Sequence, residues 1–171
     1  ARTGDARKKN GLMARHAAVH DPLTPLANRA MFDDRLEHGI AQARGHGRTM
    51  ALMFIDLDGF KRINDTYGHA AGDLALQVVA SRLKGMARQE DTVARLGGDE
   101  FLYLLTELKS ERDATGVAVK VLGALSEPCD LGSHNIVAIE GLNASIGIAI
   151  FPTHGGPSAE PLKYAAEAMY R

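Results

Sequence analysis

Acidic residues in two distant stretches of the sequence are of a type and spacing that could perform phosphate chemistry. Asp56 directly follows an apolar run, and Asp99-Glu100 follows two glycines later in the chain. Carboxylates at strand ends and tight turns are oxygen ligands of the kind Mg²⁺ prefers, with substrate phosphates completing its coordination. Two such ions would activate a hydroxyl group and stabilise a leaving phosphate. We therefore expect these acids to form a divalent-metal site.

Glycines beside these acids favour a metal and phosphate site over the simpler interpretation that the acids are merely solvated turn residues. Turns are solvated, so any single acid at a turn needs no ligand to explain it. Gly59 and Gly97-Gly98 leave the backbone uncovered next to the carboxylates, where amide N–H groups can approach a phosphate. The combination predicts a phosphate site rather than unrelated surface carboxylates.

Secondary-structure signals place these acids at the ends of strands. Residues 50–55 are continuously apolar, which is typical of a central strand covered on both faces. Residues 92–96 and 101–105 flank Gly97-Gly98 and predict a hairpin, because glycine tolerates the positive φ of a tight turn. The expected helices are 30–43, 70–86, 111–125 and 161–171, and the remaining strands are 135–140 and 142–151. This order predicts an α+β fold with a central, mostly antiparallel five-stranded sheet flanked by helices.

Length and composition describe an ordinary globular domain. The 171 residues are 45% hydrophobic and 24% charged, with a formal net charge of −1, which gives no bulk attraction to nucleic acid. The single cysteine, Cys129, cannot form an internal disulfide and agrees with a reducing compartment. The longest apolar run is far shorter than the ~20 residues of a membrane span. We expect a cytoplasmic domain that binds no nucleic acid, in a full-length protein that could still be tethered to a membrane.

The two ends of the chain differ from the middle. Residues 1–15 hold five basic groups and one acid. We interpret residues 1–19 as a linker or signalling helix from an upstream domain, with binding to anionic lipid or nucleic acid as an alternative. The last residues, 168–171, stop inside an apolar-periodic stretch without a capping signal. We therefore expect residues 20–171 to be one domain with a truncated C-terminal end.

Ordered motifs along the chain resemble the GGDEF domain, the diguanylate cyclase family. Residues 95–101, Arg-Leu-Gly-Gly-Asp-Glu-Phe, read as the name-giving motif. Further matching segments are 21–29, 56–61, 64–65, 68–69, 72–73, 144–149 and 168–170. One departure is Pro25, which stands where the family usually has glycine. The resemblance covers residues 20–171 and implies a fold like that of nucleotidyl cyclases and polymerase palm domains.

The resemblance implies that two GTP molecules are condensed into cyclic di-GMP and two pyrophosphates by a homodimer, with Mg²⁺ or Mn²⁺ as cofactor. It also implies the roles of individual residues. Asp56, Asp99 and the Leu57 carbonyl would bind the metals, and Glu100 would assist the metals or the deprotonation of the 3′-hydroxyl. The implied substrate-binding residues are Gly59, Phe60 and Lys61 for the triphosphate, Asn64 and Asp73 for guanine, and His69 at the edge of the same pocket.

A second site is expected five residues before the double glycine. Arg88 and Asp91 have the spacing of the family's RxxD inhibitory site, where the product cyclic di-GMP docks. Arginine can form a fork with a phosphate or with O6 and N7 of guanine. The simpler interpretation is a surface ion pair at a helix end. Lys120 is a weak candidate for a further basic partner from the next helix.

Two alternatives to the cyclase remain open at this point. The first is a catalytically weak GGDEF module that binds GTP or cyclic di-GMP and regulates an attached phosphodiesterase of the EAL type, beside fused sensory domains. The second treats residues 54–59 as the aspartyl-phosphate motif of haloacid-dehalogenase-like phosphatases, with Asp56 as nucleophile. Phe60 stands where that motif usually has Thr or Val, and 55 residues precede Asp56, so this alternative is disfavoured.

Overall fold

The computed structural model describes residues 13–15, 18–131 and 139–152, which form an α+β fold. Within these residues, four strands make an antiparallel sheet in the order β2-β3-β1-β4. The strands are β1 (Thr49–Leu57), β2 (Thr92–Gly97), β3 (Glu100–Leu108) and β4 (Ala144–Phe151). The helices are α2 (Arg29–His46), α3 (Phe60–Tyr67), α4 (His69–Met86) and α5 (Glu111–Ser126).

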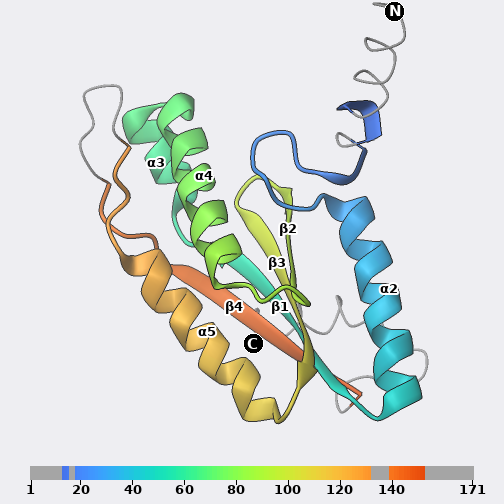
Figure 1. Ribbon diagram of the computed structural model, residues 1–171. Helices are drawn as coiled ribbons and strands as arrows, with labels where there is room; N and C mark the ends of the chain where they lie inside the picture. The colour runs from blue at the N-terminus through green and yellow to red at the C-terminus, as the bar shows by residue number, and fades with distance from the viewer. Residues whose placement is uncertain (1–12, 16–17, 132–138, 153–171) are drawn as a thin grey trace, which may run out of the picture.

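Helices cover both faces of the sheet, α2 on one side and α4 with α5 on the other (Figure 1). Successive strand residues point to opposite faces, so β1 contributes to two cores. Met50, Leu52 and Phe54 pack towards α2, whereas Met53 and Ile55 belong to the core under α4 and α5. Burial on both faces explains the continuously apolar sequence of β1 and confirms that it is a central strand.

The predicted five-stranded sheet is wrong by one strand. Residues 132–138 lie outside the described part of the chain, and Ile139 forms an isolated antiparallel bridge with Cys129 through two N–H···O bonds of 2.9 Å. A Cβ atom at Gly141 would overlap the carbonyl oxygen of Ser126, so the chain passes directly against the end of α5. Ile139 therefore pairs with the segment after α5 and does not form a hairpin with β4. The helix expected at 161–171 lies outside the described residues.

A short helix, α3, occupies the region between β1 and α4 where the sequence predicts a polar loop. Gly59 precedes α3 with φ 69°, and Gly68 separates α3 from α4 with φ 87°. Both values lie in the left-handed region that favours glycine. These two glycines turn the chain sharply, so that α3 and the first turn of α4 pack together beside the end of β1 (Figure 1).

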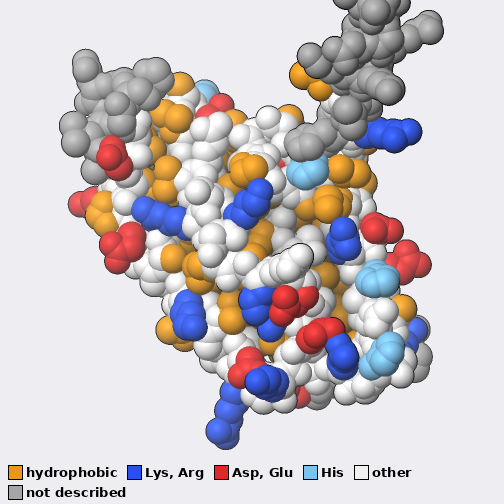
Figure 2. Space-filling model, viewed as in Figure 1, with side chains coloured by type: hydrophobic (Ala, Val, Ile, Leu, Met, Phe, Trp, Pro, Cys, Tyr) orange, Lys and Arg blue, Asp and Glu red, His pale blue; other side chains and the backbone are white. Residues whose placement is uncertain are grey.

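The surface of the described residues carries charges of both signs. Figure 2 shows acidic and basic side chains interspersed on the face viewed, without segregation into one large basic area. None of the described helices combines the length and apolar character needed to cross a membrane.

Candidate functional site

A cluster of carboxylates forms where β1 ends against the β2–β3 hairpin. Asp56 and Glu100 are directly opposite each other in the antiparallel pairing of β1 with β3. Asp99 lies at the hairpin tip, and its carbonyl oxygen accepts a hydrogen bond of 3.2 Å from the Leu57 N–H. The structure thus brings together the two acidic stretches that the sequence identifies.

Burial and repulsion within this cluster together raise the pKa of the Asp56 carboxyl group. Partial burial raises the pKa of the Asp56 carboxyl group, and the charges of Asp99, Glu100 and Asp58 raise it further, in that order. Like charges directly opposite each other in a sheet destabilise the pairing. A cation placed between the carboxylates would turn this repulsion into attraction, so the donor set is chemically suited to a divalent metal ion.

Protein side chains alone do not form a complete metal cage. In residues 13–15, 18–131 and 139–152, no group of three His, Cys, Asp or Glu side chains is gathered closely enough to hold an ion. Mg²⁺ is usually held by one or two carboxylates, with waters and substrate phosphates as its other ligands. The expected set of Asp56, Asp99, Glu100 and the Leu57 carbonyl fits that pattern, and its metal-binding role stays a prediction.

Asp58 lies just beyond β1, and hydrogen bonds to the segment that starts β4 engage its side chain and its N–H. Its Oδ1 accepts a hydrogen bond of 2.8 Å from Ser145 Oγ, and its N–H donates to the Asn143 carbonyl at 2.9 Å. These bonds tie the end of β1 to the start of β4, which fixes the backbone from which Asp56 projects.

The N-terminus of α3 lies one turn beyond the carboxylates. Phe60 and Lys61 are its first two residues, and no described side chain caps it. The first N–H groups of a helix have no partner within the helix and favour anions. The Phe60 ring is buried in the core, so only its backbone can face a ligand, whereas the Lys61 side chain is exposed. The resemblance implies that Gly59, Phe60 and Lys61 hold a triphosphate, and this role stays a prediction.

The predicted guanine-reading residues come from α3 and the first turns of α4. Asn64 is half-buried on α3, and Asp73 is exposed on α4. His69 is the exposed first residue of α4. The tight junction at Gly68 places these three residues on adjoining turns of one helical pair.

The predicted inhibitory residues Arg88 and Asp91 form a two-pronged ion pair. Arg88 Nε and Nη2 donate to the two carboxylate oxygens of Asp91 at 3.1 and 2.9 Å, and Nη2 also donates to the Thr106 carbonyl at 2.8 Å. A further contact of 3.2 Å joins Arg88 to Glu90. The hydrogen bond to Asp91 raises the pKa of Arg88. The Asp91 side chain is almost fully buried, whereas the guanidinium group remains half-exposed.

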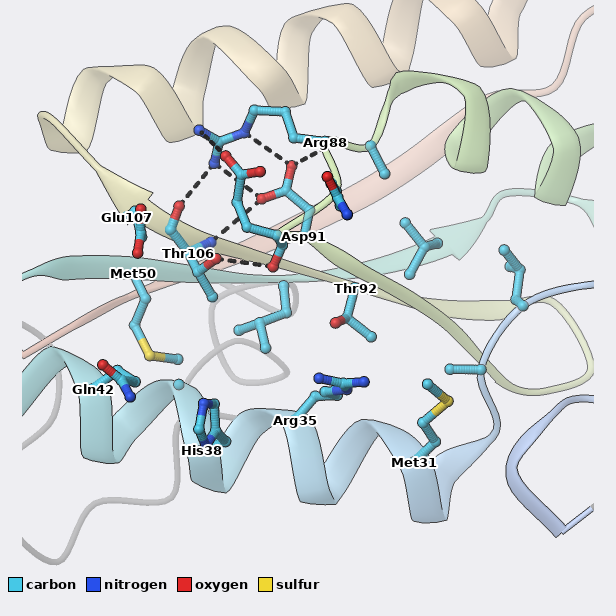
Figure 3. Close-up of a pocket in the computed structure, with 18 of the residues that line it drawn as sticks. Met31, Arg35, His38, Gln42, Met50, Arg88, Asp91, Thr92, Thr106 and Glu107 are labelled. Atoms are coloured by element: carbon cyan, nitrogen blue, oxygen red, sulfur yellow. Dashed lines mark hydrogen bonds and ion pairs between the residues drawn. The ribbon is translucent and has the colours of Figure 1, made fainter. Parts of the chain in front are cut away.

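A groove of about 730 Å³ lies between α2 and the β2–β3 hairpin, away from the carboxylate cluster. Figure 3 shows Arg35 and His38 of α2 pointing across this groove towards Arg88 and Asp91. The sulfur-bearing side chain of Met50 forms part of its floor. This groove is thus next to the predicted inhibitory residues and not at the predicted catalytic ones.

A second hollow of about 440 Å³ lies on the other side of Arg88, against α5. Arg88 and Lys120 both line it, so the structure brings these two predicted partners together. Lys109 and Arg112 line the same hollow, and sequence analysis misses both. No local signal identifies them, because their proximity to Arg88 depends on how α5 packs against β3.

Comparisons with known proteins agree with this architecture. The diguanylate cyclase GGDEF domain family matches residues 18–171. Over 153 residues, 90% of this chain, the sequence is 46% identical to MucR of Pseudomonas aeruginosa, a bifunctional diguanylate cyclase/cyclic di-GMP phosphodiesterase. Over 155 residues, 91% of this chain, it is 44% identical to the diguanylate cyclase TpbB of the same bacterium. These matches span only 22% of MucR and 35% of TpbB.

Solved structures show the same fold. The GGDEF domain alone of TpbB matches with a TM-score of 0.82 at 43% identity, covering 88% of this chain and 86% of that chain. The coiled coil and GGDEF domain of DgcB from Caulobacter crescentus, in complex with cyclic di-GMP, matches with a TM-score of 0.84 at 27% identity, covering 99% and 87%. With the family match, the shared sheet and the hairpin motif, these findings show that the chain belongs to the GGDEF family of diguanylate cyclases.

Proposed function

We propose that this chain catalyses the condensation of two GTP molecules into cyclic di-GMP and two pyrophosphates. The observation that carries the proposal is the cross-strand pair of Asp56 and Glu100, with Asp99 adjacent and the Asp56 pKa raised by burial and by the surrounding charges. The repulsion between these carboxylates destabilises the strand pairing, and a cation bound between them would stabilise it. The family membership supports the same reaction.

Different residues around the cluster bind different parts of GTP. Amide groups of Gly59 and Phe60 at the start of α3 hold the triphosphate, and Lys61 adds a positive charge. The Asp73 carboxylate accepts hydrogen bonds from N1–H and the 2-amino group of guanine, which adenine cannot offer in that arrangement. Asn64 contributes a second polar contact to the base, and His69 lines the edge of the pocket.

Mg²⁺ or Mn²⁺, when bound, supplies charge neutralisation at the phosphates and activation of the 3′-hydroxyl. Asp56, Asp99 and the Leu57 carbonyl hold the ions, and Glu100 orients the attacking hydroxyl or accepts its proton. Each chain holds one GTP, so the reaction requires two copies that face each other about a two-fold axis. We propose that this homodimer works in the cytoplasm as one part of a larger signalling protein.

Product control is proposed to act at the Arg88–Asp91 pair. A cyclic di-GMP molecule docked in the hollow against α5 meets Arg88 and Lys120, which both line it. Lys109 and Arg112 add positive charge for its two phosphates. Buried Asp91 holds the Arg88 fork in place and leaves one edge of the guanidinium group accessible.

Nucleotide turnover tests the catalytic proposal. The purified chain is incubated with GTP and Mg²⁺, and the nucleotides are separated by chromatography. Asp99→Asn is expected to abolish cyclic di-GMP formation while circular dichroism remains unchanged. Asp34→Asn, which alters an exposed carboxylate on α2, serves as the matched control and should retain activity. Undiminished synthesis by Asp99→Asn would refute the assignment of the carboxylate cluster.

A second candidate is a GGDEF module that binds GTP or cyclic di-GMP and regulates an attached phosphodiesterase. This candidate is supported by the similarity to MucR, a bifunctional protein of which the match spans only 22%. GTP binding by the wild-type chain without any turnover, in the chain and in a longer protein that contains it, would support this candidate over the cyclase.

A further inference from the structure

We infer that Gly72 is a positioning residue that sets the orientation of the Asn64 amide for guanine recognition; this rests on the proposed function. Gly72 is buried in the first turn of α4, and Asn64 is half-buried on α3. A Cβ atom at Gly72 would overlap Oδ1 of Asn64 and lie 3.0 Å from its Cγ. The Asn64 amide group therefore rests directly against the main chain of Gly72.

The backbone of the α3–α4 junction holds the two residues in this relation. The Gly68 N–H donates to the Asn64 carbonyl at 2.8 Å, and the Gly72 N–H donates to the Gly68 carbonyl at 3.1 Å. One glycine thus links the main chains of Asn64 and Gly72 through two hydrogen bonds. Asp73 follows Gly72 directly, so both proposed guanine-reading residues lie beside the same close contact.

A methyl group at position 72 would displace Asn64 rather than disrupt the fold. The same Cβ atom would lie 3.2 Å from Cζ of Phe60, whose ring is buried in the core. A shift of a few tenths of an ångström relieves the contact with the ring, whereas the overlap with Asn64 is relieved only if the amide, at the end of a flexible, half-buried side chain, turns away. The expected consequence of Gly72→Ala is therefore a rotated Asn64 side chain on an otherwise intact helix pair.

Helix propensity alone would favour alanine at this position. Gly72 has an ordinary helical backbone, and glycine is a weaker helix former than alanine. Gly85 on the same helix is a matched control, because a Cβ atom there meets nothing within 4 Å in the described part of the chain. The two Gly→Ala changes are chemically identical, but only the one at position 72 is buried and brings a methyl group against Asn64 and Phe60.

The test measures KM and kcat for GTP, together with affinities for GTP and ATP by titration calorimetry. Gly72→Ala is expected to raise KM and the dissociation constant for GTP about tenfold, the equivalent of one lost hydrogen bond. We expect kcat at saturating GTP to change little, and the preference for GTP over ATP to shrink. Gly85→Ala should match the wild type in every value. A wild-type GTP affinity in Gly72→Ala would overturn the inference.

A double variant separates this role from a general structural one. Asn64→Ala removes the atoms that a methyl group at position 72 would overlap. Adding Gly72→Ala to Asn64→Ala is therefore expected to cause no further loss of GTP affinity. An additional loss, or a double variant that fails to fold, would show that Gly72 acts independently of Asn64 and would overturn the inference. A wild-type chain without preference for GTP would overturn the proposed function itself.

Discussion

The Arg95 guanidinium group joins Asp21 to the tip of the β2–β3 hairpin. Nη1 donates to the two carboxylate oxygens of Asp21 at 3.0 and 3.2 Å, and Nε donates to the Gly98 carbonyl at 3.0 Å. The two charged side chains are only 11% and 7% exposed. Because Gly98 directly precedes Asp99, this pair connects the segment before α2 to the loop that carries the proposed catalytic acids.

Arg95→Met is expected to lower the free energy of unfolding by about 3 kcal/mol. The substitution leaves the Asp21 carboxylate buried without its counter-charge, which is strongly unfavourable in a protein interior. Asp21 still accepts hydrogen bonds from the following turn, so we expect the lower end of the range for broken buried pairs. Urea denaturation followed by circular dichroism measures the change.

The exposed pair of Arg29 with Asp33 provides the control for this experiment. Both side chains are 53% exposed and lie one turn apart on α2. Exposed ion pairs contribute little, so Arg29→Met should change the free energy of unfolding by less than about 0.5 kcal/mol. Equal losses in the two variants would contradict a special role for Arg95.

Asp56→Asn is expected to stabilise the chain at neutral pH in the absence of metal. The native state raises the pKa of this carboxyl group above its ordinary value of 3.8, so it binds a proton more readily than the unfolded state. The favourable contribution of Asp56 is therefore present below that value and is lost as pH rises through the raised pKa. The gain from Asn should be full at pH 7 and shrink as pH falls towards 3.8.

Denaturation curves at several pH values check this sign, with Asp34→Asn as the exposed control. The variant should also lose any stabilisation that added Mg²⁺ gives the wild type. A gain in stability that does not depend on pH would show that the raised pKa of Asp56 has no energetic consequence.

Elements with strong local signals could be predicted from the sequence. The helix predicted at 111–125 is found as α5 (Glu111–Ser126), because Ser110 and Asp113 form a capping box at its start. The helix α3 is missed because it is eight residues long and buries only Phe60 and Ile63. A helix of two turns with two buried residues leaves too short an apolar pattern to recognise.

The site could be predicted only in part, because local signals identify single residues but not which residues meet in the fold. Asp56 and Asp99 could be identified because each is adjacent to a local feature, a strand end and a glycine pair. The pairing of Asp56 with Glu100 depends on the register between β1 and β3, which single-sequence patterns do not specify. The contact of Gly72 with Asn64 likewise depends on the packing of α3 against α4.

Arg82→Met is expected to loosen the end of α5 and expose Cys129. The Arg82 guanidinium group donates to the carbonyl oxygens of Ala124, Glu127 and Pro128 at 2.9, 2.7 and 2.7 Å. Losing these charged hydrogen bonds should lower the free energy of unfolding by about 2 kcal/mol. Burial raises the pKa of the Cys129 thiol and Arg82 lowers it in part, so the cysteine should resist alkylation in the wild type, and faster labelling of Arg82→Met can only come from exposure of the thiol.

The rate of iodoacetamide labelling measures this opening directly. Labelling of Cys129 should be faster in Arg82→Met than in the wild type, under conditions in which circular dichroism shows both to be folded. Equal labelling rates would mean that the Arg82 contacts do not hold the segment that covers the thiol.

Glu90→Gln is expected to strengthen cyclic di-GMP binding at the proposed inhibitory site. Glu90 lies 3.2 Å from Arg88 Nη1 and is itself exposed, so it competes with a phosphate or guanine for the accessible edge of the guanidinium group. Exposed ion pairs are worth at most about 1 kcal/mol, which limits the gain in affinity to about fivefold. Lys120→Ala should act in the opposite direction, because it removes a cation from the hollow that Arg88 also lines.

Titration calorimetry with cyclic di-GMP distinguishes these two effects, with Glu37→Gln on the exposed face of α2 as a charge-matched control. The control should bind like the wild type, because Glu37 lines neither hollow. Weaker binding by Glu90→Gln would mean that Glu90 helps to orient Arg88 and does not compete for it. Unchanged binding by Lys120→Ala would argue against the hollow beside α5 and direct attention to the groove beside α2, which Arg35 lines.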